Sequence, residues 1–103
     1  MHARVTRYEG GSPESLEQNL EQKKNVLPTE PGQTEGMKGV IFLTDRGSGA
    51  ITVISLWEDE NALQASEDEA VRVREEVTAP GERASVEHCE VALLEVEQSA
   101  PGI

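Results

Sequence analysis

The stretch AITVISLW, residues 50–57, decides the fold of this protein because it is apolar on both faces of a predicted strand. One face carries Ile51, Val53 and Trp57, and the other carries Ala50, Ile54 and Leu56. A strand with one face in water shows polar residues at every second position, so both faces of this strand need a cover. We therefore predict a strand inside a sheet that has a layer on each side.

Three more strands are predicted around this one. Residues 2–8 and 83–96 contain alternating apolar positions, and residues 36–44 hold an apolar run. The segment 45–49 (DRGSG) is rich in residues that tolerate positive φ, which predicts a hairpin turn into AITVISLW.

Two helices are predicted between the strands. The first has an N-cap at Ser12 with proline at the next position, and it stops at Pro28. The second begins at the acids 58–60, restarts at a capping box formed by Ser66 and Glu69, and ends near 79–81. The order is strand, helix, strand, strand, helix, strand, which is the ferredoxin-like βαββαβ unit. We predict an α+β fold with a four-stranded antiparallel sheet and two helices on one face.

Length and charge restrict the organisation of the chain and its partners. The 103 residues suffice for one domain, predicted over 1–97, with a loose tail at 98–103. Twenty acidic residues against nine Lys and Arg give a net charge of -11, which disfavours nucleic acid and anionic membranes as partners. No apolar run suits a membrane span or signal core, and the single Cys89, expected to be buried, has no disulfide partner. We predict a cytoplasmic protein.

The face of such a sheet that lies away from the helices is bare unless something covers it. The two apolar faces of residues 50–57 indicate that it is covered. A second copy pressed sheet against sheet is an economical cover, since two-fold homodimers are the commonest soluble oligomers. The alternative is a monomer whose central strand is simply apolar.

The string SLWEDENALQAS, residues 55–66, joins a strand ending in Trp directly to an acid-rich helix and a kink of small residues. It resembles the dimeric α/β-barrel superfamily, and within it the antibiotic biosynthesis monooxygenase-like proteins, over roughly residues 2–94. The resemblance implies a homodimer whose sheets form a barrel, with a small-molecule cavity between sheet and helices in each subunit. It also implies oxidation of aromatic polyketide intermediates by dioxygen without flavin, haem or metal, so no cofactor is expected; other members degrade haem.

The resemblance carries expectations for single residues. In the cofactor-free type a Trp ending the third strand and an Arg late in the second helix line the cavity. Trp57 matches the first, and Arg74 matches the second if three residues are missing from the kink. That type also has an Asn four residues before the Trp and a Tyr six residues after it, where this chain has Val53 and Leu63. Haem-degrading members need a helical His, and residues 59–78 contain none, so haem degradation is not expected.

Four residues are candidates for the site, and each has a structural alternative. Trp57 either fills the core or stacks on a flat ligand. Arg74 has no acidic residue three or four positions away, so it points to a cavity, to a carboxylate on the sheet or along the surface to water. Tyr8 either reaches a ligand or closes the edge of the core, and His88 is either a general base or an exposed strand residue. No His or Cys spacing suits a metal.

Two functions are compatible with these residues. The first is a cofactor-independent monooxygenase-like homodimer acting on a small, electron-rich aromatic, in which Trp57 stacks on the ring and Arg74 stabilises a developing oxyanion. The second is a ligand-binding or structural dimer of the same fold without chemistry, which Val53 and Leu63 favour. Either small-molecule function requires that Trp57 and Arg74 share an open cavity of about 300 Å³ or more.

Overall fold

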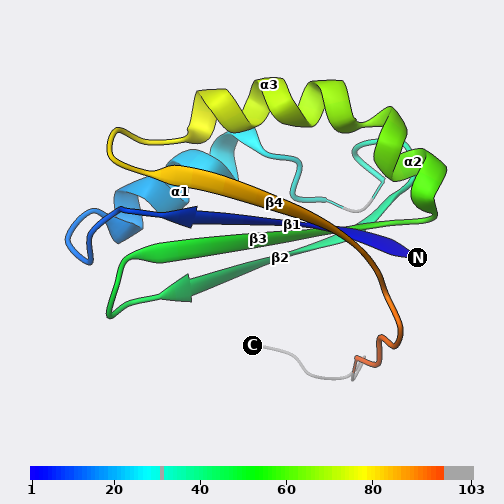
Figure 1. Ribbon diagram of the computed structural model, residues 1–103, viewed down its shortest axis with the longest axis horizontal. Coiled ribbons are helices and arrows are strands. Elements are labelled where there is room, and N and C mark those ends of the chain that lie inside the picture. The colour runs from blue at the N-terminus through cyan, green and yellow to red at the C-terminus, as the bar shows by residue number, and fades with distance from the viewer. Residues whose placement is uncertain (31, 97–103) are drawn as a thin grey trace.

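A computed structural model describes residues 1–30 and 32–96, and it shows the predicted order with the second helix in two parts (Figure 1). The elements are β1 His2–Glu9, α1 Leu16–Val26, β2 Met37–Asp45, β3 Ala50–Trp57, α2 Glu60–Ala65, α3 Glu67–Val77 and β4 Arg83–Glu90. The tail predicted at 98–103 lies outside the described residues. No helix within the described ranges is long and apolar enough to cross a membrane.

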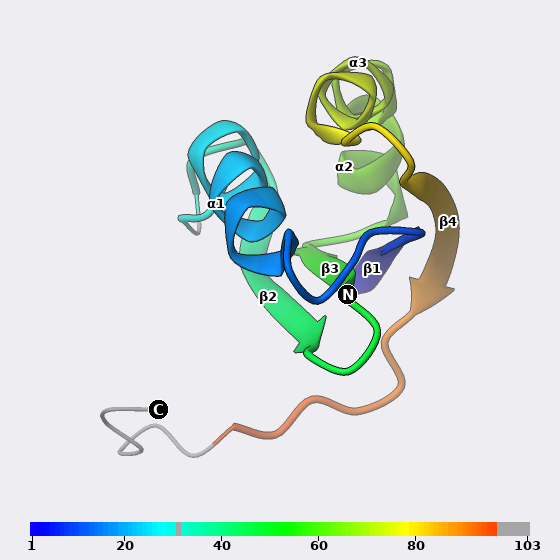
Figure 2. The ribbon, with the colours of Figure 1, turned by 90° about the vertical axis from the view of Figure 1, so that its left-hand side faces the viewer.

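The four strands form one antiparallel sheet in the order β2-β3-β1-β4. AITVISLW is β3, an inner strand paired with β1 on one side and β2 on the other. All three helices lie on one face of the sheet and leave the other face uncovered (Figure 2). The predicted ferredoxin-like fold is therefore confirmed.

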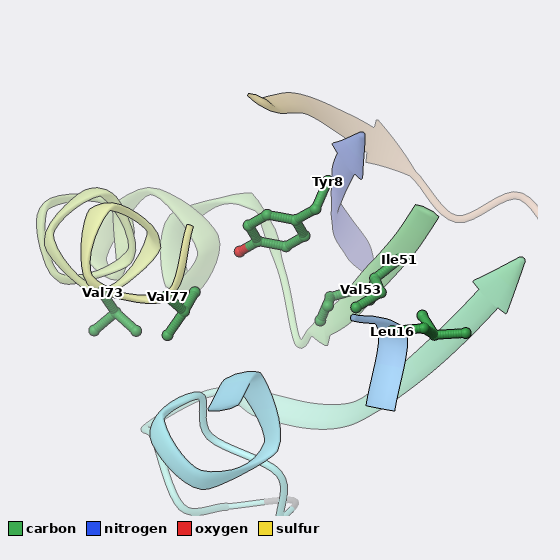
Figure 3. Packing of buried hydrophobic residues seen from close by; sticks show 6 residues of the cluster. All are labelled: Tyr8, Leu16, Ile51, Val53, Val73 and Val77. Atoms are coloured by element: carbon green, nitrogen blue, oxygen red, sulfur yellow. The ribbon is translucent and has the colours of Figure 1, made fainter. Parts of the chain in front are cut away.

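The core lies between the sheet and the helices, and it holds the Ile51, Val53, Trp57 face of β3. One cluster of buried residues comprises Tyr8, Leu16, Ile51, Val53, Val73 and Val77, six residues from four elements (Figure 3). A second cluster comprises Met37, Trp57 and Leu63. Because register partners share a face, the β1 residues Arg4, Thr6 and Tyr8 also point toward the helices. The apolar positions Ala3 and Val5 of this strand thus lie on the opposite, open face of the sheet.

The open face of the sheet is apolar. Val5, Ile54 and Ile41 are register partners across three strands on this face. Ile41 is 40% exposed and Leu43, two residues along β2, is 49% exposed. The two-faced pattern of β3 predicts an apolar row on this face together with a cover for it, and the single chain supplies the row without the cover.

The final strand is shorter than predicted: it ends at Glu90 instead of Val96. Glu90 pairs with His2, the first residue of β1, so β1 offers only one further acceptor, the Met1 carbonyl, which receives a hydrogen bond from Val91 N at 2.9 Å. Residues 91–96 then leave the sheet on its open side (Figures 1 and 2). The strand ends because its partner does.

Two helix starts also differ from the prediction. The first helix begins at Leu16 rather than Pro13, because the hydroxyls of Ser12 and Ser15 bond each other and each other's backbone in a turn. The second helix does restart at Ser66, but this side chain forms no cap. The Ser66 hydroxyl donates to Leu63 O at 2.7 Å and accepts from Arg4, so the capping box is not formed.

Candidate functional site

A cavity of about 430 Å³ lies between the sheet and the helices. Its walls come from β1, β3, α3 and the segment that joins α1 to β2. Trp57, Arg74 and Tyr8 all line it, although they belong to three different elements. The volume exceeds the 300 Å³ or so that a small-molecule site requires.

Trp57 is both a core residue and a wall of this cavity. Its side chain packs with Met37 and Leu63, and the residue is 3% exposed. The indole Nε1 donates to Ser55 Oγ at 2.9 Å, which satisfies its only polar atom and orients the ring. The Arg4 guanidinium carbon lies 5.5 Å from the ring centroid, within cation–π range. The two interpretations of Trp57 are therefore compatible with each other.

Arg4 is a buried cation in the cavity wall. Its Nη2 donates to Leu63 O at 3.1 Å, Ser66 Oγ at 2.8 Å and Glu67 Oε2 at 3.1 Å. Its Nε is buried without a hydrogen-bond partner among the described residues. Burial lowers the pKa of Arg4 below its ordinary value, and the Glu67 carboxylate opposes that shift.

Arg74 has a partner that the sequence reasoning missed. Its Nη2 lies 3.7 Å from Oε1 of Glu67, which precedes it by seven residues on the same helix. Two turns of helix return to the same face, so a search limited to three and four residues overlooks this carboxylate. The carboxylate beside Arg74 therefore comes from its own helix, and not from the sheet as one of the expected alternatives had it. The placement of Arg74 on the cavity is observed together with this ion pair.

His88 does not line the cavity with Trp57 and Arg74. It lies on the far side of Glu67, with Nε2 3.0 Å from Oε2, and borders a separate shallow hollow. Glu67 thus gathers Arg4, Arg74 and His88 around one carboxylate. Its only sequence signal is the spacing of seven from Arg74. The neighbouring Cys89 is exposed, contrary to the expectation that it is buried, because it lies on the uncovered face of the sheet.

Tyr8 lies at the other end of the cavity. The residue is 1% exposed, and its ring projects from β1 with the hydroxyl directed toward α3 (Figure 3). Burial raises the pKa of Tyr8 to about 12. At neutral pH the phenol is protonated and can donate a hydrogen bond into the cavity.

A buried ion pair supports Tyr8 from behind. Lys23 Nζ lies 4.4 Å from the Tyr8 ring centroid and donates to Glu82 Oε1 at 2.8 Å and Val77 O at 3.1 Å. Both charged side chains are 0% exposed. Glu82 Oε1 also accepts from Ala79 N at 2.8 Å, so the pair ties α1 to the turn between α3 and β4. Sequence reasoning did not identify this pair, because 59 residues separate its members.

The cavity wall contains no histidine that could ligate haem iron. The chain has two histidines, and both lie on strands outside the cavity walls: His2 on β1 and His88 on β4. Among the described residues, no group of three or more His, Cys, Asp or Glu is arranged to hold a metal ion. The histidine ligand that the resemblance implies for haem-degrading members therefore has no counterpart in this cavity.

Comparison with known proteins gives structural matches only. No protein-family model and no curated protein matches the sequence. The heme-degrader MhuD of Mycobacterium tuberculosis matches with a TM-score of 0.64 and 20% identity over 93% of this chain and 100% of its own. SnoaB of Streptomyces nogalater, a cofactor-independent oxygenase, matches with a TM-score of 0.65 and 13% identity, covering 93% and 97%. A dimeric ferredoxin-like protein from an uncultured marine organism gives 0.68 and 9%, covering 93% and 91%.

These matches extend along 93% of this chain and 91–100% of each matched chain. The fold that the resemblance of residues 55–66 implies is thereby confirmed. The chain shares its fold with these proteins.

Proposed function

We propose that the protein is a cofactor-independent monooxygenase-like enzyme that oxidises a flat, electron-rich aromatic molecule with dioxygen. The observation that carries this proposal is the convergence of Trp57 and Arg74, from different elements, on one open cavity of about 430 Å³. The fold shared with SnoaB, a cofactor-independent oxygenase, supports it.

Three side chains have separate roles in this proposal. The Trp57 ring stacks on the substrate, and the Tyr8 phenol donates a hydrogen bond to one of its oxygens. The substrate itself supplies the electrons: a phenolic ring with a C–H para to its hydroxyl reacts with O₂ to give a quinone and one water, which balances without a reductant. The Arg74 guanidinium stabilises the negative charge on the ring oxygen after the hydroxyl loses its proton to water and before an electron passes to dioxygen. His88 takes no part, because it does not line the cavity.

Oxygen uptake tests this function. Wild type is mixed with dihydroxy-aromatic substrates of two or three rings that keep a C–H para to a hydroxyl, such as 1,5-dihydroxynaphthalene, and uncatalysed autoxidation is subtracted. We expect Arg74→Ala to slow uptake about 100-fold and Trp57→Phe to slow it less, since Phe keeps an aromatic face. Arg72→Ala is the control, because Arg72 lies on the exposed side of the same helix and pairs with Glu69. Equal rates in wild type and Arg74→Ala would refute the proposal.

A second candidate function is ligand binding without chemistry. Val53 lines the cavity at a position where the resembling enzymes carry an Asn, and Leu63 is buried where they carry a Tyr. The cavity therefore has fewer polar groups than those enzymes use. Saturable binding of aromatic molecules without any enzyme-dependent oxygen uptake would favour this second function over the first.

We also propose a homodimer formed through the open face of the sheet. The exposed apolar row that includes Ile41 and Leu43 gives the driving force. Light scattering should give about twice the chain mass of 11.2 kDa at micromolar concentration. Ile41→Glu should give the single-chain mass, whereas Val71→Glu should not: the two residues are 40% and 41% exposed, but Val71 lies on α3. A wild-type mass of one chain would contradict the dimer.

A further inference from the structure

The charge that the cavity wall presents inward is positive, although the net charge of the protein is negative. The chain carries a net charge of -11, yet the charged residues that line the cavity are Arg4, Arg74 and Glu69. The Glu69 carboxylate is 63% exposed and pairs with Arg72 on the outer side of α3. The inward charge of the wall therefore comes from two guanidiniums.

One carboxylate is shared between these two guanidiniums. Glu67 accepts a hydrogen bond from Arg4 at 3.1 Å, but its approach to Arg74 is 3.7 Å, which is beyond hydrogen-bond distance. No described residue accepts a hydrogen bond from the Arg74 guanidinium, although its side chain is only 17% exposed. Five N–H donors at a mostly buried position call for an acceptor, and the cavity is where one can enter.

Most of the remaining wall is apolar and aromatic, and its uncharged polar residues are Thr6, Gln33, Thr34, Ser55 and Ser66. Val40, Val53 and Val73 line it together with the Trp57 ring, whose own N–H is already bonded to Ser55. A ligand that satisfies both parts is a flat ring system with a negatively charged oxygen group at one end. A planar guanidinium pairs with a carboxylate through two parallel N–H bonds, which a neutral amide cannot match.

We propose that the cavity selects aromatic acids, with the ring system against Trp57 and the carboxylate held by the guanidinium of Arg74. This inference rests on the proposed function only in placing a ligand in the cavity, and it is independent of any oxidation. Within that function it narrows the substrate class to aromatics whose carboxylate lies close to the oxidised position.

Calorimetric titration with 2-naphthoate and 2-naphthamide tests the selectivity, because the two probes share their rings and differ in charge. We expect wild type to bind 2-naphthoate about tenfold more tightly, and its affinity, but not that of 2-naphthamide, to fall as salt is raised. The single Trp of the chain gives one indole N–H resonance, which should shift with either probe. Equal affinities, or no binding of either probe, would overturn the inference.

Variants at position 74 test whether the Arg74 guanidinium causes the preference for the charged probe. Arg74→Met, which keeps an apolar stem, should abolish the preference by weakening 2-naphthoate about tenfold while 2-naphthamide changes less than about twofold. Arg74→Lys should retain part of it, because it keeps the charge and loses the planar fork. Arg72→Met is the matched control, since it removes the same charge from the exposed side of α3, and it should leave the preference intact. Equal loss of both probes in Arg74→Met would refute the assignment.

The two proposals fail separately. Preference for 2-naphthoate without oxygen uptake from any aromatic substrate would refute the oxidation and support the selectivity. Oxygen uptake from neutral dihydroxy-aromatics at the same rate as from their carboxylated counterparts would support the oxidation and overturn the selectivity.

Discussion

The buried pair of Lys23 and Glu82 gives the sharpest test of how this fold is held together. Both side chains are 0% exposed, with Nζ and Oε1 2.8 Å apart. In Lys23→Met the Glu82 carboxylate still accepts a hydrogen bond from Ala79 N at Oε1. Its Oε2 is already buried without a hydrogen-bond partner and gains no partner in the variant. Removing one member of a buried pair leaves an uncompensated charge and costs about 3–5 kcal/mol. For a chain of this size that loss lowers Tm by about 15 °C or more.

The measurement is urea unfolding followed by circular dichroism at one fixed protein concentration. Lys24→Met is the matched control, since the adjacent Lys24 is 53% exposed and lies 3.9 Å from Glu21. An exposed pair of this kind contributes about 0.5 kcal/mol or less. A double-mutant cycle adds Glu82→Leu alone and Glu82→Leu together with Lys23→Met. The double variant should recover most of the lost free energy of unfolding, because no buried charge then remains.

Two results would refute this reasoning. A cost below about 1 kcal/mol for Lys23→Met would mean that water reaches the carboxylate. A double variant whose free energy of unfolding falls by the sum of the two single changes would mean that the charges are not coupled.

Three further predictions concern single positions. Tyr8 is the only Tyr, and its pKa of about 12 exceeds its ordinary value of 10.0. The pH-dependent stability that this shift supplies is therefore complete below pH 10, falls as the pH rises from there to about 12, and is absent in Tyr8→Phe. Ultraviolet titration of the phenolate checks this prediction, and a midpoint near pH 10 in the folded protein would contradict it. Gly10→Ala should cost more than Gly32→Ala in thermal unfolding, since both have positive φ but a Cβ at Gly10 meets Gly81 O at 2.3 Å and one at Gly32 meets nothing within 4 Å; equal costs would rule out the clash. Asp59→Ala should lower the free energy of unfolding by about 1 kcal/mol because the side chain accepts from a backbone N–H of α2, and Asp59→Asn should restore most of it.

The order of the elements and the position of β3 were predictable from sequence because they depend on local patterns. Alternation, glycine-rich turns and helix spacing each involve residues fewer than ten apart. The errors arose where a distant residue decides the outcome. The last strand ends at Glu90 because its partner β1 begins at His2, and the Ser66 hydroxyl leaves its cap to meet Arg4.

The candidate site was predictable only in part. Trp57 and Tyr8 stand out as single aromatics, and Arg74 stands out beside an apolar stripe. Glu67 does not stand out, because it is one of three consecutive acids at a helix start, a pattern that usually indicates a solvated face.

The sequence by itself determined the ferredoxin-like order and the need for covers on both faces of AITVISLW, since these follow from which residues avoid water. Only the tertiary structure decided which charges meet. Glu67 joins Arg4 of β1, Arg74 of its own helix and the His88 ring of β4, and Lys23 meets a carboxylate 59 residues away. Side-chain charges pair through space at a few ångströms, and the spacing that brings them together is set by the packed sheet and helices, not by the chain.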